Sequence, residues 1–406
     1  MYDTSNYTSR IKKRVYEKLD MSTDIDDKDL RNVIEECVQE ESKVYIIPLR
    51  QREIIEESVF NAIRRLDILQ EILEDDSITE IMINGSKDIF IERNGNLQRW
   101  DKHFETTDKL EDVAQKIAAL SNKIVNTSIP IVDTRLDDGS RVSIVLPPIA
   151  IDGPVITIRK FYDDPLTMDK LIKLHSVTQE AAEFLEKAVK AKYNIFISGA
   201  TGSGKTTFLN VLSNYIPSDE RVITIEDSAE LQIKNIDNLV RLESRKANIE
   251  GKNEITIRDL IKASLRLRPD RIVVGEVRGD ETLDMVQAMT TGHDGSLSTG
   301  HGNSPQDMMS RLETMILMGM DMSLSAVRKQ LVSAIDIIIH LGRLRDRTRR
   351  VMKIVEIAGL QNGEVQYNTL FEFKETGEKD GKVLGGLVST QKELIHKEKL
   401  FAAGIS

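Results

Sequence analysis

The run GATGSGKTT, from Gly199 to Thr207, holds the residues of this sequence that are best suited to bind phosphate. It follows an apolar segment and fits the spacing G-x-x-x-x-G-K-[ST], in which glycines let backbone N–H groups surround phosphate oxygens at the start of a helix. Lys205 would bring a positive charge to the β- and γ-phosphates, and the hydroxyl of Thr206 would bind Mg²⁺. An accidental glycine-rich turn is the alternative. The order of strand, loop and helix favours a nucleotide site at Gly199, Thr201, Gly202, Ser203, Gly204, Lys205, Thr206 and Thr207.

Acidic residues follow two further apolar segments, as nucleotide hydrolysis would require. Glu276 comes just after the segment 272–274, and Glu226, Asp227 and Glu230 follow the segment 222–225. The C-terminal ends of parallel strands meet at one edge of a sheet, so these carboxylates can reach the same phosphates. Hydrolysis needs a carboxylate beside Mg²⁺ and a base that aligns the attacking water. Acidic turns after strands are common, and only their combination with the phosphate loop predicts an ATP-hydrolysing site.

Two histidines, His293 and His301, lie in a segment rich in Gly, Ser and Thr, residues 290–305, which indicates a loop. By residue type alone, metal ligation and plain solvent exposure are equally open. Two histidines and Asp294 are too few ligands to predict a structural zinc site.

Helices and strands alternate from residue 175 onward, which is typical of a parallel sheet covered on both faces. Past residue 304 the pattern is helical to about residue 332, and two strands follow. This part of the chain is predicted as an α/β domain over residues 175–360, with strands at 194–198, 222–226, 271–274, 335–344 and 350–358 and helices at 179–191 and 257–266.

The first 160 residues follow another pattern. Helical apolar spacing recurs over residues 7–19, 30–38 and 54–73, and it changes to period two between Ile81 and Trp100. A helix at 108–123 and strands near 142–146 and 155–158 follow. The predicted parts are an N-terminal helical appendage at 1–49, a mixed α/β domain at 50–160, a linker at 161–174 and, after the second domain, a polar C-terminal tail at 361–406.

Composition excludes several classes of protein. The 406 residues are 40% hydrophobic and 30% charged, which suits globular domains rather than low-complexity or disulfide-rich chains. The 56 basic and 66 acidic residues give a net charge of −10, so nucleic acid or anionic lipid could be met only by a local basic patch. Cys37 stands alone at a helical apolar spacing, which predicts a buried thiol in a reducing compartment. With no signal-peptide pattern and no apolar run of about 20 residues, we expect a cytoplasmic protein.

With these motifs in place, the sequence resembles the ATPases of type II secretion, type IV secretion and type IV pili. Within that superfamily it is most similar to the CpaF-type ATPase of the Tad (tight adherence) pilus, over residues 81–359. The resemblance rests on GATGSGKTT, ITIEDSAELQ, LRLRPDRIVVGEVRG and TGHDGSLSTGHGNSP, which occur in the family's order, and on RLRDRTRRV. One cysteine cannot form the tetracysteine zinc site usual in extension and type II secretion ATPases, which leaves CpaF-like or retraction-like branches.

The resemblance implies a homo-hexameric motor that hydrolyses ATP with Mg²⁺ and powers Tad pilus assembly, retraction or related secretion. The implied fold is a RecA-like P-loop domain with a parallel sheet, preceded by a smaller mixed α/β (PAS-like) domain and N-terminal helices. The motor would lie in the cytoplasm, peripherally associated with the inner face of the cytoplasmic membrane, against platform proteins of the inner membrane. No nucleic-acid partner is expected.

The resemblance also assigns roles to single residues. Lys205 and Thr206 would bind phosphate and Mg²⁺, and Glu276 would order the metal's surroundings. Glu230 would activate the attacking water. The remaining nucleotide contacts implied by the motifs are Glu226, His293 and His301.

Arginines of the first domain would complete the site, according to the same resemblance. Arg141 and Arg159 lie in segments similar to those that supply arginines to the nucleotide, and a planar guanidinium suits the charge of a transferring phosphoryl group. Arg135 lies in the same segment as Arg141. Surface ion pairing with Asp133, Asp137 or Asp138 is an equally open alternative for Arg135.

The sequence is compatible with two other functions and with two roles for one basic cluster. A RecA-like motor that translocates DNA would need a basic or aromatic channel, for which 5% aromatic residues and a charge of −10 offer little support. A nucleotide-dependent scaffold without hydrolysis is disfavoured by Glu230 and Glu276. A basic cluster in the acidic chain would face a platform protein or lipid headgroups, or form a solvated hairpin turn; it comprises Arg343, Arg345, Arg347, Arg349, Arg350 and Lys353.

Overall fold

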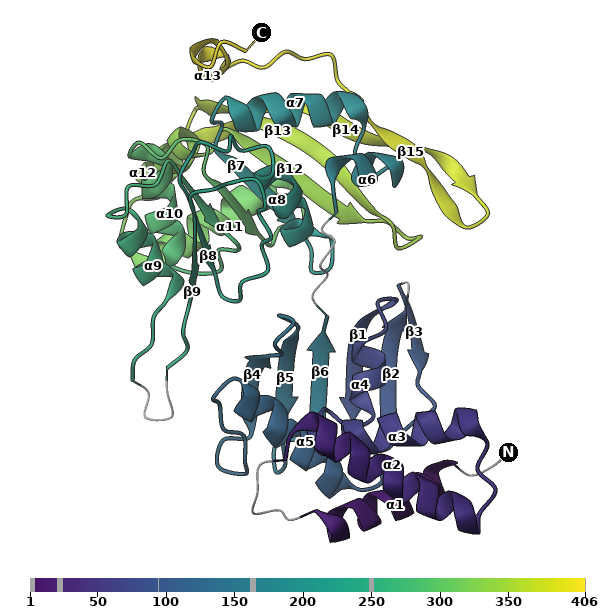
Figure 1. The fold of residues 1–406 in the computed structure, drawn as a ribbon. Helices are drawn as coiled ribbons and strands as arrows, with labels where there is room; N and C mark the ends of the chain where they lie inside the picture. The colour runs from purple at the N-terminus through teal and green to yellow at the C-terminus, as the bar shows by residue number, and fades with distance from the viewer. Residues whose placement is uncertain (1–3, 20–24, 94, 161–165, 248–251, 406) are drawn as a thin grey trace. The chain divides into compact units, whose positions relative to one another are not determined.

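The computed structural model of the chain describes residues 4–19, 25–93, 95–160, 166–247 and 252–405 (Figure 1). It consists of two compact units, Met1–Tyr162 and Asp163–Ser406, each with cores of its own. Within the described residues, none of the helices combines the length and apolar character that crossing a bilayer requires.

Three helices at the N-terminus pack on one another around a small apolar core. They are α1 (Thr4–Lys18), α2 (Asp27–Val44) and α3 (Leu49–Arg64). Cys37 is fully buried in this core, and burial raises the pKa of its thiol. Because α3 shares the core of α1 and α2, the helical part of the chain continues past the boundary expected at residue 49.

The helix expected over residues 54–73 is interrupted. Helix α3 ends at Arg64, and a short helix, α4, spans Leu69–Leu73. Between them Asp67 has a φ of 55°, a left-handed conformation that an α-helix does not accommodate. The prediction of one continuous helix is therefore wrong, although the apolar spacing runs through the break.

An antiparallel sheet forms the rest of the first unit, with the described strands in the order β3-β2-β1-β6-β5-β4. Buried and outward-facing residues alternate along it, as at Val142 and Ser143, because one face packs against α4 and α5 (Thr107–Leu120). The strands are β1, Ile78–Asn84; β2, Asp88–Arg93; β3, Asn96–Arg99; β4, Ile131–Arg135; β5, Arg141–Val145; and β6, Val155–Arg159.

A larger sheet organises the second unit, in the order β15-β14-β13-β12-β7-β11-β10-β8-β9 among the described residues. The strands from β12 to β9 in that order pair in parallel, whereas β12, β13, β14 and β15 pair antiparallel. The strands are β7, Ile195–Gly199; β8, Val222–Glu226; β9, Leu239–Glu243; β10, Arg271–Val274; β11, Leu297–Gly300; β12, Ile337–Arg343; β13, Arg349–Gln361; β14, Glu364–Lys379; and β15, Lys382–Ser389.

Helices cover both faces of this sheet, each over an apolar core. The strands β7, β8 and β10 are buried along their whole length, as parallel strands between two helical layers must be. The predicted α/β fold is confirmed. The helices of one face are α6, Met168–Lys173; α7, Gln179–Lys190; and α8, Lys205–Ser213; those of the other are α9, Ile257–Ser264; α10, Glu281–Thr290; α11, Pro305–Gly319; and α12, Leu324–Ala334.

Two segments expected to lack regular structure contain elements of the second unit. Strand β11 lies inside the segment 290–305 and is fully buried between β7 and β10. Helix α6 occupies the second half of the predicted linker 161–174, with Leu171 in the core, while residues 161–165 lie outside the described residues.

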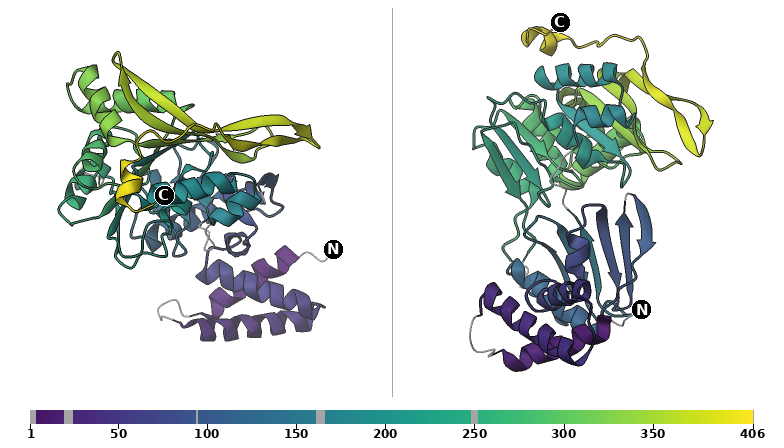
Figure 2. Two further views of the ribbon diagram at one scale, coloured as in Figure 1. Left: turned by 90° about the horizontal axis from the view of Figure 1, so that it is seen from above. Right: turned by 45° about the vertical axis from the view of Figure 1, so that its right-hand side comes forward.

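The segment 361–406, expected as a polar tail sparse in core residues, also differs from its prediction. It contains β14 and β15, a long hairpin that projects beyond the other elements of the second unit (Figures 1 and 2). The base of this hairpin is buried in the apolar core on one face of the sheet, through Leu370, Phe371 and Leu387. The prediction fails because a hairpin exposed over much of its length needs few apolar residues.

Beyond the hairpin, a buried carboxylate helps to hold the last described segment, which Tyr193 and the ion pairs of Lys399 also contact. Glu356 of β13 is only 1% exposed, and it accepts hydrogen bonds from the backbone N–H groups of Ile395 and His396 and from the Asn368 amide. Burying a carboxylate without such donors would be costly. This contact therefore fixes the segment that leads into α13 (Glu398–Ala402).

We expect Glu356→Ala to loosen this segment, because two backbone N–H groups lose their acceptor and the Asn368 amide keeps only the Glu393 carbonyl oxygen. Amide hydrogen exchange around residues 391–405 should become roughly a hundredfold faster, the effect of about 3 kcal/mol of lost local stability. Glu375→Ala is the matched control, since Glu375 is an exposed carboxylate that pairs with Arg345. Unchanged exchange in the Glu356 variant would contradict this account.

Candidate nucleotide-binding site

The predicted phosphate loop and its acidic and histidine partners lie at one edge of the second unit's sheet. Strands β7, β8, β10 and β11 are parallel neighbours, so their C-terminal ends lie at the same edge. The phosphate loop follows β7, Glu226 ends β8, Glu276 follows β10 and His301 follows β11. The fold thus brings together motifs that are far apart in the sequence.

The loop has the backbone geometry that its glycines predict. Gly202 and Gly204 have φ angles of 73° and 92°, which residues with a side chain rarely adopt. A Cβ atom on Gly199 would lie 2.5 Å from Ser203 Oγ and 2.7 Å from the Leu341 carbonyl oxygen, so no larger residue fits there. Helix α8 begins at Lys205, directly after the loop, and its first N–H groups are free of helical partners. A helix start preceded by such a loop is suited to phosphate.

Lys205 reaches the centre of the site from the first turn of α8. It is 8% exposed, and its Nζ donates to the Ala200 carbonyl oxygen at 3.3 Å and lies 3.3 Å from His301 Nδ1. Burial lowers the pKa of Lys205, and the charge of Glu276 opposes this effect. Both contacts are long, so phosphate oxygens would be better partners for this ammonium group.

Glu276, after β10, contacts His301 at the end of β11 and is also bound by Arg278. Glu276 Oε1 lies 2.7 Å from His301 Nε2, and Arg278 Nε donates to Glu276 Oε2 at 2.9 Å. Burial lowers the pKa of His301, while Glu276 acts in the opposite direction. The imidazole therefore links Lys205 to Glu276. Arg278 was not among the predicted site residues, although its position two residues after Glu276 in GEVRG could have indicated it.

Glu226 and Glu230 differ in their surroundings. Glu226 is 3% exposed, and its Oε1 accepts hydrogen bonds from the backbone N–H groups of Glu230 and Leu231 at 2.9 and 3.0 Å. Its Oε2 is buried without a hydrogen-bond partner among the described residues. Burial raises the pKa of Glu226 to about 7, and the two backbone hydrogen bonds oppose this shift. Glu226 thus holds the loop that carries the partly exposed Glu230.

The donors present suit Mg²⁺ better than zinc. The described residues contain no cluster of three or more His, Cys, Asp or Glu side chains that could hold a metal ion. Mg²⁺ does not need such a cage, because it usually binds one or two protein oxygens, substrate phosphates and several waters. Thr206, in the first turn of α8, and Glu276, on the same sheet edge, offer oxygens of this kind.

The structure does not bring the two predicted histidines together. His293 precedes β11 and His301 follows it, so the strand's four residues, about 13 Å, separate them. The ring of His293 lies 3.3 Å from the Ala288 carbonyl oxygen, at the end of the sheet opposite the phosphate loop. Of these two residues, His301 is the one placed beside Lys205.

The three predicted arginines lie in the first unit. Arg135, Arg141 and Arg159 occupy directly opposed positions on the neighbouring strands β4, β5 and β6, so they share one face of that sheet. Arg141 and Arg159 are exposed. The register continues to Glu80 on β1, which lies directly opposite Arg159, so the row of three arginines ends beside a carboxylate.

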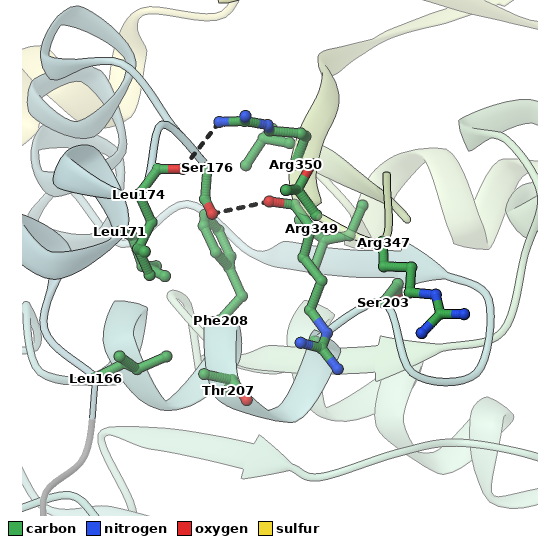
Figure 3. Close-up of a pocket in the computed structure, with 14 residues that line it drawn as sticks. Leu166, Leu171, Leu174, Ser176, Ser203, Thr207, Phe208, Arg347, Arg349 and Arg350 are labelled. Atoms are coloured by element: carbon green, nitrogen blue, oxygen red, sulfur yellow. Dashed lines mark hydrogen bonds between the residues drawn. The ribbon is translucent and has the colours of Figure 1, made fainter. Parts of the chain in front are cut away.

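A pocket that sequence reasoning missed adjoins the phosphate loop (Figure 3). Its volume is about 270 Å³. One side is apolar, with Leu171 and Phe208, and the other is formed by residues 347–351, which end the turn after β12 and begin β13. Because these groups are more than 100 residues apart in the chain, no local pattern could have indicated the pocket.

Comparison with known proteins identifies relatives over most of the chain. The family described as type II/IV secretion system protein matches residues 64–382, more than half of the chain. A putative conjugal transfer protein of Mycobacterium tuberculosis is 31% identical over 330 residues, which are 80% of this chain and 93% of the relative. Protein VirB11 of Agrobacterium fabrum is 33% identical over 298 residues, covering 66% of this chain and 86% of VirB11.

Solved structures share the fold. The pilus retraction motor PilT with bound ADP has a TM-score of 0.52 at 19% identity, covering 84% of this chain and 88% of PilT. The ATPase DotB of Legionella pneumophila has a TM-score of 0.51 at 22% identity, covering 72% of this chain and 80% of DotB. At these identities the likeness concerns the fold alone.

The buried Glu226 predicts a pH dependence of stability. Its pKa is about 7 in the folded chain and 4.5 when fully solvated, so between these values the folded chain keeps a proton that the unfolded chain releases. Stability should therefore fall by roughly 3 kcal/mol as the pH rises from about 4.5 to about 7, and no further above that.

Glu226→Gln should remove this pH dependence, because glutamine still accepts the two backbone hydrogen bonds but does not titrate. The measurement is urea unfolding of the full chain, followed by signals of the second unit, at several pH values. Glu243→Gln, at the paired position on β9, is the control. Equal slopes in wild type and the Glu226 variant would show that folding does not raise the pKa of Glu226.

Proposed function

We propose that this chain, which belongs to the type II/IV secretion system protein family, hydrolyses ATP with Mg²⁺ to drive a pilus or secretion machine at the cytoplasmic membrane. The observation that carries the proposal is the meeting of Lys205, Glu276 and His301 at one sheet edge, with Glu230 on the neighbouring loop. The names of the relatives support it, because PilT is a motor found with ADP and DotB is an ATPase.

The site's own residues would share the work of hydrolysis. The loop N–H groups and Lys205 would hold the phosphates and meet the charge that develops during phosphoryl transfer. Bound Mg²⁺ would neutralise phosphate charge from its place beside Thr206 and Glu276. Glu230, placed by Glu226, would accept the proton of the attacking water. His301 would give up its contact with Lys205 when a phosphate oxygen binds to this lysine.

We further propose a homo-hexamer that acts on a platform protein of the inner membrane, as part of a Tad-type pilus. Three features support this subtype: the four ordered motifs, the basic turn RLRDRTRRV, and a single cysteine where a tetracysteine zinc site would need four. Relatives that serve conjugal transfer and pilus retraction fit a motor that moves other components.

Glu230→Gln should bind nucleotide normally but lose hydrolysis by at least a hundredfold, because the amide keeps the shape of the carboxylate and cannot accept a proton. Phosphate release and titration with a fluorescent ADP analogue measure the two properties separately. Lys205→Ala is the companion variant and should lose both. Normal hydrolysis by Glu230→Gln together with its loss in Glu226→Gln would move the base to Glu226.

Arg159→Ala should slow hydrolysis at least tenfold with little change in ADP affinity, because the arginine is proposed to meet charge that peaks in the transition state. Arg99→Ala is the control, since Arg99 is an exposed arginine of the same sheet that pairs with Asp88. Circular dichroism and size measurement check folding and assembly. Normal turnover in a folded, assembled Arg159 variant would remove this arginine from the proposed site.

A further inference from the structure

The basic segment at the start of β13 is hydrogen-bonded to the phosphate loop. Arg349, the first residue of β13, donates from Nε to the carbonyl oxygen of Gly202 at 2.9 Å. Its Cδ would lie 3.4 Å from a methyl group placed on Gly204. The side chain therefore lies along the glycine-rich part of the loop, 147 residues away in sequence.

This contact fixes a peptide whose other side is also held. The Ser203 N–H donates to the Ala200 carbonyl oxygen at 3.2 Å, while the Gly202 carbonyl of the same peptide accepts from Arg349. A peptide unit is planar, so these two hydrogen bonds together set the orientation of the 202–203 peptide. A loop with this peptide set loses less conformational freedom when it binds phosphate.

The backbone around Arg349 is itself held firmly. Ser176 Oγ donates to the Arg349 carbonyl oxygen at 2.8 Å, and the Val351 N–H donates to the Ser176 carbonyl oxygen at 2.8 Å. Arg350, 8% exposed, donates to the Leu174 carbonyl oxygen at 2.9 Å (Figure 3). The strand start that carries Arg349 is thus anchored to the connection between α6 and α7.

Members of the basic cluster have different partners. Arg345 forms ion pairs with Glu375 and Glu378, and Lys353 forms one with Glu372. Arg349 pairs with no carboxylate among the described residues, and its exposed side chain lines the pocket beside the loop. A guanidinium group without an anionic partner, next to a phosphate loop, is suited to recognise phosphate.

We propose that Arg349 is a positioning residue for the nucleotide: it presets the phosphate loop through Gly202 and adds positive charge where the phosphates bind. The proposal rests on the nucleotide site proposed above. The pocket behind Arg349 has the apolar wall that a nucleoside base requires, and at about 270 Å³ it is smaller than most whole-ligand pockets, which suits one part of a nucleotide. Because these contacts form already in the bound ground state, loss of Arg349 should weaken nucleotide binding and leave the rate of the chemical step nearly unchanged.

The test compares Arg349→Ala with Arg345→Ala, a variant of the same turn whose arginine is engaged by Glu375 and Glu378. Full-length protein is titrated with a fluorescent ADP analogue, and KM and kcat for ATP are measured. We expect Arg349→Ala to raise the Kd for ADP and the KM for ATP roughly tenfold, with kcat changed less than twofold. Arg345→Ala should leave all three at wild-type values.

Arg349→Lys separates the two parts of the effect, because lysine keeps the charge and lacks the guanidinium Nε that binds Gly202. We expect an intermediate Kd, and the same measurement on this variant decides the matter if the alanine variant does not fold. A Kd within twofold of wild type in a folded Arg349→Ala protein would overturn the proposal. Failure of wild type to bind the analogue would instead overturn the proposed nucleotide site, so the two failures are distinguishable.

Discussion

The parallel pairing of β7, β8, β10 and β11 is the constraint on which the site depends. Parallel neighbours end at the same edge, and here each of the four is followed by a chemical group: the phosphate loop, the Glu226–Glu230 turn, Glu276 and His301. Burial on both faces holds the strands in register, since their side chains are packed in two separate cores. Chemistry at this edge therefore depends on packing within the sheet.

The opposite edge of the same sheet carries structural polar contacts. Arg271, fully buried at the start of β10, binds the carboxylate of Glu220 just before β8. Asn194, before β7, accepts hydrogen bonds from the N–H groups of Gly295 and Ser296, before β11. These contacts hold the first residues of the strands in place. Because the strands are only four or five residues long, the positions of their C-terminal ends follow.

What the sequence could predict depended on how local the signal was. The phosphate loop and the acidic turns follow from short spacings, and alternating patterns identify the parallel sheet. Strand β11 escaped prediction because three of its four residues, Ser298, Thr299 and Gly300, are small and lack the apolar pattern of a buried strand. A Cβ at Gly300 would lie 2.8 Å from Met308 Cε and 3.0 Å from Phe196 Cε1, so the packing around the strand favours glycine at this position. Because the strand was not predicted, the separation of His293 from His301 was not predicted either. The contact of Arg349 with the phosphate loop joins residues that are 147 positions apart, so no local pattern could indicate it.

Glu226 is a buried carboxylate that holds a loop in place. Its Oε2 has no hydrogen-bond partner among the described residues, and a neutral or apolar side chain at that position would suit the surrounding core better. An apolar residue would leave the backbone N–H groups of Glu230 and Leu231 without their acceptor, whereas a neutral amide would keep both hydrogen bonds. The position therefore suits a side chain that accepts two hydrogen bonds without carrying a charge, as glutamine or a protonated glutamate does.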